Sequence, residues 1–290
     1  MATLYTVGPA TFGATAINQV TGSDYNAGLE AVLLAADGSV SPTFVAVGQQ
    51  APRITMETTK VGTVLTAIAA AGSTISSPSA LFSTTLRKRV AGGRLSVTTD
   101  NVSLSCTDGI IVPRRLSIPH VPPASLSFEV IPITSNQANA PITLAVNAAA
   151  PTPDDVSEIY CVGDVDLGAT EIDGVMDIEI DFGIAERVLM SDGNVWPSQV
   201  CIVRQAPTAV IRTTNADLVN TLTVQGTQKT TCTIVLQAVA RGGLRSGTDK
   251  TITIPDAHCV VRSIGNGDDS MTEIVLTGVY DGTNAVISIA

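Results

Sequence analysis

The sequence predicts a mainly β fold with two tandem homologous β-sandwich or β-barrel domains, each with one flanking α-helix. Gly, Thr, Ser, Ala and Val are abundant, while aromatic residues make up 3% and charged residues 14% of the 290 residues, which favours many short strands and turns. A helical bundle would need more Leu, Glu and Lys. Apolar or alternating runs bounded by turn residues predict the strands, and an internal repeat predicts the two domains.

The repeat joins residues 4–61 to residues 159–216 at a constant offset of 155. LYTVGPATFGATAINQV corresponds to IYCVGDVDLGATEIDGV, and 20 of the 58 aligned positions are identical, about 34%. An ungapped match of this length indicates a tandem duplication. We predict a first β domain over 1–148, a linker over 149–156 within NAAAPTPDDVS, and a second, homologous β domain over 157–290.

After residue 61 the copies match only with gaps. LSIP at 116–119 resembles ITIP at 252–255. This alignment leaves the first copy with about 20 extra residues, mostly between 95 and 115. It therefore predicts an extra hairpin or arm over about 87–115.

Each copy begins with short strands around an Asp-Gly turn, at 37–38 and at 192–193. Asp-Gly between apolar runs is a strong hairpin signal, since both central residues must accept positive φ. A helix is then predicted in KVGTVLTAIAAAG, where apolar residues recur at helical spacing between a Thr and Gly72, and in the equivalent TTNADLVNTLTVQG. The rest reads as strands, among them SLSFEVIPI, TCTIVLQAVA and TEIVLTGVY.

One predicted strand, VMDIEIDFGI, alternates Asp177, Glu179 and Asp181 with apolar residues, so that it has one acidic and one apolar face. It is either an ordinary solvent-facing strand or a surface that repels polyanions. In the first copy, Asp24 falls among the matching positions, which are polar but less charged.

Charge differs between the halves. Residues 1–155 hold 8 basic and 9 acidic side chains, whereas residues 156–290 hold 8 basic and 17 acidic ones. Most basic residues of the first half lie in the predicted arm: Arg87, Lys88, Arg89, Arg94, Arg114 and Arg115. The arm is either a solvated hairpin or a basic segment that docks on the acidic face of a neighbouring subunit.

No catalytic residues, metal site or cofactor are predicted. The two histidines, the absence of GxSxG, phosphate-loop and HExxH motifs, and the adjacent His258 and Cys259, which a strand would place on opposite faces, argue against an enzyme. The acidic residues of GDVDLGATEIDG do not follow the EF-hand spacing, so a polar turn is favoured over calcium binding. The odd count of five cysteines without CxxC indicates free thiols in a reducing compartment.

The formal net charge of −10 argues against a protein that grips nucleic-acid phosphates. No apolar run reaches the roughly 18 residues that span a bilayer, and the N-terminal residues do not resemble a signal peptide. We therefore expect no membrane association.

Taken together, the duplicated β-rich unit, the helix after Thr-Thr, the acidic balance, the DGxVxP turn and the QAP–TT segment resemble the major tail tube proteins of long-tailed bacteriophages. The resemblance covers the whole chain at the level of the fold. It implies β-sandwich or barrel domains with a flanking helix, assembled in the host cytoplasm into stacked rings of the virion tail. It also implies a lumen through which double-stranded DNA passes without specific binding, and contacts with other tail proteins at the tube ends.

Rings of that family contain six domains, so a duplicated chain implies three chains per ring with pseudo-sixfold symmetry, and six chains as the alternative. Asp177, Glu179, Asp181 and Asp24 are then the candidate lumen-facing acidic residues. Two other classes stay open: another virion component, such as a decoration, tail terminator or baseplate protein, and a tandem β-sandwich adhesive module.

Overall fold

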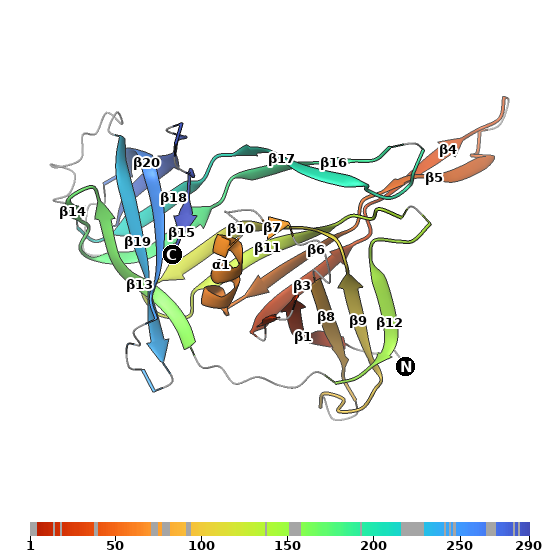
Figure 1. Cartoon of the computed structure of the whole chain (residues 1–290), viewed down its shortest axis with the longest axis horizontal. Helices are drawn as coiled ribbons and strands as arrows, with labels where there is room; N and C mark the ends of the chain where they lie inside the picture. Colours follow the sequence, from red (N-terminus) through yellow and green to blue (C-terminus); the bar gives the residue numbers. More distant parts are fainter. Residues whose placement is uncertain are drawn as a thin grey trace.

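The computed structural model describes residues 5–290 except 14, 18, 38–39, 71–74, 77–81, 91–93, 137, 151–157, 192, 216–228, 241, 244, 246–247, 265–270, 281 and 284. The described chain is mainly β, as the sequence predicts, with large antiparallel sheets and the helix α1 (Val61–Ala70). Figure 1 shows an elongated molecule in which the first half of the chain lies beside the second.

The smaller sheet comes from the first half of the chain. Its strands, in spatial order, are β12 (Thr143–Ala148), β9 (Asn101–Cys106), β8 (Phe82–Lys88), β1 (Tyr5–Phe12) and β2 (Thr15–Ile17). Phe12 packs edge-on against Phe82 at a ring-centroid distance of 6.4 Å and also lies 6.0 Å from Phe128 of the larger sheet. The two sheets therefore share one core.

The larger sheet runs without a break through both halves of the chain. Its path is β14 (Thr170–Glu171), β13 (Glu158–Leu167), β19 (Lys229–Ala240), β20 (Lys250–Ser263), β21 (Thr272–Gly278), β18 (Thr208–Thr213), β15 (Val175–Asp181), β10 (Gly109–Pro119), β11 (Ser125–Pro132), β6 (Arg53–Thr58) and β3 (Val20–Asn26). Two short strands pair beside it: β7 (Ile75–Ser76) with β10, and β22 (Ser288–Ile289) with β20.

The join between the halves is the antiparallel pair β10–β15, which runs from Arg115 opposite Asp181 to Pro119 opposite Asp177. One face of these strands is apolar and buried, because every second residue points into the core. Ile118 and Ile178, which face each other across the join, are both fully buried. The predicted domains thus share a sheet and a hydrophobic core instead of forming two separate sandwiches.

Two hairpins leave the sheets. The first is β4 (Leu29–Leu34) with β5 (Phe44–Gln50), and the second is β16 (Ile184–Leu189) with β17 (Gln199–Gln205). The sequence predicts both, although Gly38 and Asp192 of their Asp-Gly turns lie outside the described residues. In Figure 1 the second hairpin runs alongside the first half of the chain, whereas the first hairpin projects beyond the body.

Helix α1 forms where it is predicted, directly after a turn in which Thr58 accepts a 3.0 Å hydrogen bond from the Lys60 amide. Its buried face meets the second half of the chain: a Cβ on Gly62 would lie 2.2 Å from the Tyr160 hydroxyl. Only a glycine allows this close approach of helix and ring. The predicted end at Gly72 and most of the predicted second helix lie outside the described residues.

Strands 155 residues apart have the same bounds and the same irregularities. The bounds agree residue for residue between β3 and β15, β4 and β16, β5 and β17, and β6 and β18. The register shift after Val20 in the pair β3–β6 recurs after Val175 in β15–β18. Gly28 and Gly183 both have positive φ, at 56° and 58°. A tandem duplication would produce these correspondences, and it stays a prediction.

Cross-strand partners extend this correspondence and correct the predicted arm. Phe82, the partner of Phe12, corresponds to Cys232, an offset of 150. The next partners, Cys106 and Ile254, differ by 148. If the two halves are duplicated, this register makes β9 and β10 together correspond to β20, and the first copy then has seven extra residues in place of the expected block of about 20 between 95 and 115. The expected match of LSIP with ITIP misplaces that register, and the segment 109–119 is an interior strand, not an arm.

Candidate functional site

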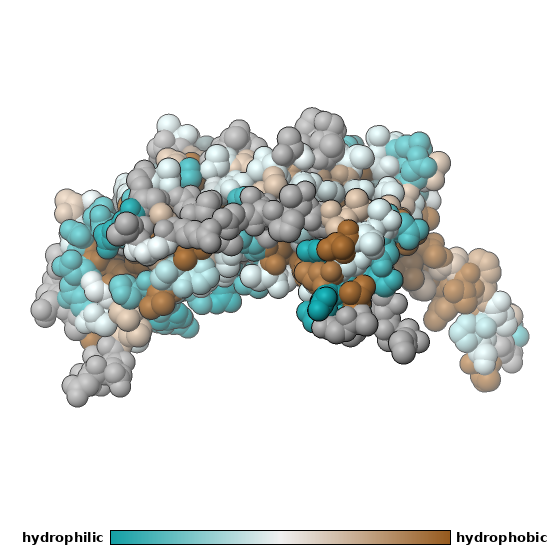
Figure 2. Space-filling view, turned by 90° about the horizontal axis from the view of Figure 1, so that it is seen from below, coloured by the Kyte–Doolittle hydropathy of each residue, from teal (hydrophilic) through white to brown (hydrophobic). Residues whose placement is uncertain are grey.

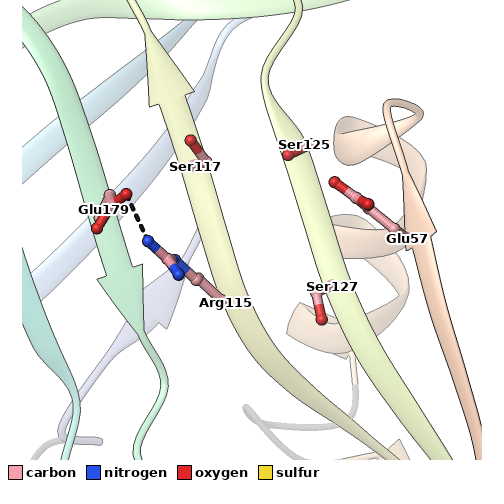
Figure 3. Close-up of a pocket in the computed structure, with 6 residues that line it drawn as sticks. All are labelled: Glu57, Arg115, Ser117, Ser125, Ser127 and Glu179. Atoms are coloured by element: carbon pink, nitrogen blue, oxygen red, sulfur yellow. Dashed lines mark ion pairs between the residues drawn. The ribbon is translucent and has the colours of Figure 1, made fainter. Parts of the chain in front are cut away.

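The face of the large sheet that points away from the core is polar where the two halves join. Figure 3 shows its centre, a shallow hollow between four neighbouring strands. The hollow is lined by Glu57 of β6, Ser125 and Ser127 of β11, Arg115 and Ser117 of β10, and Glu179 of β15. This face exists because polar residues alternate with buried apolar ones along each strand.

The four candidate acidic residues all lie on this polar face. Asp177, Glu179 and Asp181 stand on β15 opposite residues 119, 117 and 115 of β10. Asp24 stands on the edge strand β3 opposite Thr55, and is therefore on the same side as Glu57. Register and alternation thus bring together acidic residues that are distant in the sequence.

The acidic row is partly neutralised by arginines of the same chain. Arg115 lies 2.5 Å from Glu179, and Arg212 lies 2.5 Å from Asp177. Arg212 also lies 3.6 Å from Glu273, which pairs with Arg262 at 2.9 Å. Hydrogen bonding to Asp177 raises the pKa of Arg212. The predicted row is therefore a mixed, arginine-bridged surface and not a bare carboxylate strip.

Acidic residues nevertheless predominate on this surface. Among the described residues, the charged side chains of this face and of the hairpin base beside it include eight acidic and five basic ones: Asp24, Glu57, Glu129, Asp177, Glu179, Asp181, Glu186 and Glu273 against Arg53, Arg114, Arg115, Arg212 and Arg262. The balance is three negative charges per chain. A surface of this sign repels phosphate, most strongly at low salt.

The six candidate basic residues are not one cluster. Arg87, Lys88 and Arg89 stand at the end of β8, and Arg94 follows in the connection to β9. Lys88 pairs with Asp100 at 2.9 Å, and Arg87 donates a hydrogen bond to the Ser96 carbonyl. Arg114 and Arg115 lie on β10, where both make ion pairs within the chain. Arg114 and Arg115 therefore do not belong to one docking arm with the other four residues.

A four-residue ion-pair network fastens the second hairpin to the first half. Glu186 of β16 lies 2.6 Å from Arg53 and 2.8 Å from Arg114, and both arginines also contact Glu129. Burial would raise the pKa of Glu186, but its hydrogen bonds and charge pairing with Arg114 and Arg53 outweigh burial and lower that pKa. The Glu186 side chain is only 8% exposed, so the network holds this carboxylate ionised at neutral pH.

We expect Glu186→Gln to lower the free energy of unfolding by about 2 kcal/mol at pH 7, since it leaves two half-buried arginines with one carboxylate. The Glu186 pKa is lower in the folded than in the unfolded chain, so its contribution is present above about pH 4.5 and is lost as pH falls further. Urea unfolding at pH 7 and pH 3.5 should give a difference between variant and parent that shrinks on acidification. The exposed Glu171→Gln serves as the control, and a difference independent of pH would contradict the pairing.

Backbone hydrogen bonds also hold the second hairpin against the first half. The Gln50 amide donates to the Val195 carbonyl at 2.8 Å, and the Thr134 amide donates to the Pro197 carbonyl at 2.9 Å. The apolar side chains Val188, Val200 and Ile202 of this hairpin pack against the core. The contact therefore combines apolar packing, backbone hydrogen bonds and the ion-pair network.

The first hairpin has the same apolar positions but no such cover among the described residues. The four matched pairs are Leu29 with Ile184, Leu33 with Val188, Val45 with Val200, and Val47 with Ile202. In the first hairpin these side chains are 47–67% exposed, whereas Ile184 is 6% exposed and the other three counterparts are half-buried. Figure 2 shows the projecting hairpin with hydrophobic residues on its surface.

The exposure of this hairpin is not among the sequence-based predictions. Both hairpins carry aliphatic residues at the same positions, so hydrophobicity alone assigns them the same environment. One signal could have separated them: Glu186 corresponds to Ala31, and Arg53 corresponds to Thr208. The pairing that fastens the second hairpin therefore has no counterpart for the first.

The part of the chain that the structure describes contains no group of three or more His, Cys, Asp or Glu side chains placed to hold a metal ion. Cys106 and Cys232 are buried, which raises the pKa of each thiol to about 12. His258 and Cys259 are neighbours on β20 and point to opposite faces. No described helix is long and apolar enough to cross a membrane.

No protein-family model matches the chain, and no curated protein sequence is significantly similar to it.

Proposed function

We propose that the protein is a structural component of a phage virion that forms the tail tube, a stack of rings around a conduit for double-stranded DNA. The observation that carries this proposal is the projecting first hairpin. Its four aliphatic side chains are 47–67% exposed, whereas their counterparts in the second hairpin are covered by the first half. Exposed apolar surface of this extent is typical of a protein that assembles with its own copies, especially where equivalent residues elsewhere in the chain already pack against a neighbouring part of it.

The continuous sheet supports a tube in particular. From β20 to β3 it runs through β21, β18, β15, β10, β11 and β6, four strands from each half, with the core on one side and the polar face on the other. If the junction β10–β15 recurs between chains, the sheet continues around an axis and its edges disappear. The polar face then lines the conduit. Three chains per ring supply six such four-strand units.

The proposed action is passive. DNA slides through a lumen whose surface carries an excess of carboxylates, since phosphate finds no net basic surface to bind. The arginines that bridge Asp177 and Glu179 hold these side chains in place. No cofactor or catalytic group takes part in this proposal.

Electron microscopy of the purified protein tests the proposal. We expect hollow tubes or rings, with averages along the axis that show six lobes of two alternating kinds, as three chains would give. Twelve lobes, or two layers of six, would keep the tube and replace three chains by six. Monomers that never assemble at any concentration would overturn the proposal and favour a decoration protein or an adhesive module.

A further inference from the structure

We propose that the first hairpin and strand β3 of one chain dock on the second half of a neighbouring chain, and so repeat between chains the contact that the second hairpin and β15 make within the chain. This inference rests on the self-assembly in the proposed function and specifies its interface. The contact between the second hairpin and the first half serves as the model for this interface. Each residue expected in the new contact is the counterpart, in the other half of the chain, of a residue in that internal contact.

The first part of the contact is a strand pair. Within the chain, Arg115 of β10 lies opposite Asp181 of β15. The counterpart of Asp181 is Asn26 of β3, at an offset of 155, and the counterpart of Arg115 is Ser263 of β20, at an offset of 148. Asn26 of one chain should therefore lie opposite Ser263 of the next.

Both strands have an edge available for this pairing. β3 ends the path of the large sheet, so in the described part of the chain it pairs on one side only. Among the described residues, β20 pairs with β19 no further than His258, while residues 259–263 pair with β21 on their other side. An unpaired edge beside apolar side chains is a favoured place for strand addition.

The exposed side chains along these edges match covered ones at the internal junction. Tyr25 is 42% exposed, whereas its counterpart Ile180 is fully buried. Next to Ser263, Ile264 is 51% exposed, whereas its counterpart Leu116 is fully buried. At the internal junction Leu116 lies opposite Ile180, so the new junction places Ile264 opposite Tyr25. Each chain therefore exposes both members of an apolar pair that only a second chain can join.

The hairpin tip gives a second, independent part of the contact. In the internal contact, the Pro197 carbonyl accepts a hydrogen bond from the Thr134 amide. Pro197 corresponds to Pro42 of the first hairpin. Strands β11 and β21 correspond at an offset of 146, since Val130 and Leu276 pair with equivalent residues of β6 and β18. Thr134 therefore corresponds to Tyr280, which is 64% exposed. We expect Pro42 of one chain to reach Tyr280 of the next.

The chemistry of the two contacts differs in one respect. The ion-pair network has no counterpart between chains, because Glu186, Arg53 and Glu129 are replaced by Ala31, Thr208 and Val275. The contact between chains is thus mainly apolar, and raising the salt concentration should not dissociate it.

The geometry of the contact favours closed rings. One chain presents the hairpin and the other presents the second half, so the interface is heterologous and each chain keeps one of each surface. If each chain is related to the next by the rotation that relates the two halves, every chain can have both of its surfaces covered by neighbours only when the ring closes.

Cysteine pairing tests this interface. Asn26→Cys and Ser263→Cys are introduced together in a Cys201→Ser background, which removes the exposed native thiol, while burial raises the pKa of Cys259 to about 11 and protects it. Opposed residues on antiparallel strands have Cβ atoms about 4.5–5.5 Å apart, close to the range that a disulfide spans. Pro42→Cys with Tyr280→Cys probes the hairpin tip in the same way.

We expect mild oxidation to give disulfides between chains in most molecules of either double variant, ending in closed covalent rings. Chains with only Asn26→Cys, mixed with chains that carry only Ser263→Cys, should stop at covalent dimers. Asn26→Cys with Val97→Cys, an 82% exposed residue away from the proposed interface, is the matched control and should stay uncoupled.

The outcomes separate the interface from the proposed function. Tubes without either disulfide between chains would overturn this interface and leave the tube proposal standing. Interchain disulfides in rings that never stack would support the interface and contradict the tube. Disulfides within single chains, or unlinked monomers at all concentrations, would overturn the interface.

Discussion

Replacing Leu33 and Val45 together by Asp should abolish assembly and leave a folded monomer. Both side chains are more than half exposed in the single chain, so their loss costs the monomer little. Their counterparts Val188 and Val200 pack on the core, which indicates that a neighbouring chain would cover them in the same way.

The expected effect is large because it acts at every contact in a ring. Fully burying a Val or Leu side chain contributes about 1.5–3 kcal/mol, and the half-buried counterparts Val188 and Val200 indicate about half of that at each position. Losing both side chains should therefore weaken each contact by about 1.5–3 kcal/mol, or roughly 10- to 150-fold in Kd. Burying two unpaired carboxylates adds a further cost. Sedimentation velocity across a concentration series measures the loss, and thermal unfolding checks that the monomer keeps its stability.

The matched control is Val97→Asp with Val146→Asp, which places two carboxylates at residues of the first half that are 82% and 64% exposed outside the proposed interface. This variant should assemble as the parent does. Equal assembly of both double variants would show that the first hairpin is not an interface, whereas equal loss in both would point to added charge as the cause.

The sequence predicts the β class and the position of the first helix for local reasons. Apolar and polar residues alternate in segments such as SLSFEVIPI, which is the pattern of a strand with one buried face. The strand β11 indeed buries one face. Val61, Val64 and Leu65 have helical spacing and are buried on one side of α1. Because the offset of 155 is constant, the first and last residues of a strand in one half predict those of its counterpart in the other half, as for β3 and β15.

The fate of residues 95–115 depends on pairing that local pattern does not encode. Asn101–Cys106 and Gly109–Pro119 form two strands of different sheets, whereas the single strand β20 spans the corresponding segment of the second half. Short phrases such as LSIP and ITIP recur by composition, and only the cross-strand partners set the correct register. The predicted arm fails for this reason.

The candidate site shows the same limit. Alternation alone places Asp177, Glu179 and Asp181 on one face, and the sheet agrees. The arginines that neutralise part of this face come from β10 and β18, and no sequence spacing connects these strands to β15. The exposure of the first hairpin is equally remote from sequence, since it depends on which half has a neighbour in the same chain.

Charge reversal on the polar face should slow DNA passage while tubes still form. Asp24→Lys with Glu57→Lys changes the formal charge by about +4 per chain and turns the face from net acidic to net basic. Neither side chain makes an ion pair with another described residue, so the change leaves the arginine bridges of Asp177 and Glu179 in place. Both point away from the core, so the strand ladders keep their packing.

The physical reason for the expected delay is counterion release. Each phosphate held by a lysine makes DNA binding fall with salt at a log–log slope of about −0.9, so a basic lumen retains DNA strongly at low salt and weakly at high salt. Particles built from the variant should eject DNA at least about tenfold more slowly in 50 mM salt and recover most of the parent rate in 500 mM salt. Time-resolved dye entry or light scattering from triggered particles measures the rate.

Asp164→Lys with Glu171→Lys is the matched control, because it makes the same charge change on β13 and β14, two strands at the far end of the large sheet from the polar face. If the polar face lines the conduit, the control should eject at the parent rate in both salts. Slowing by both variants would mean that total charge, not its position, controls ejection. Parent-like ejection by Asp24→Lys with Glu57→Lys at low salt would place this face outside the path of the DNA.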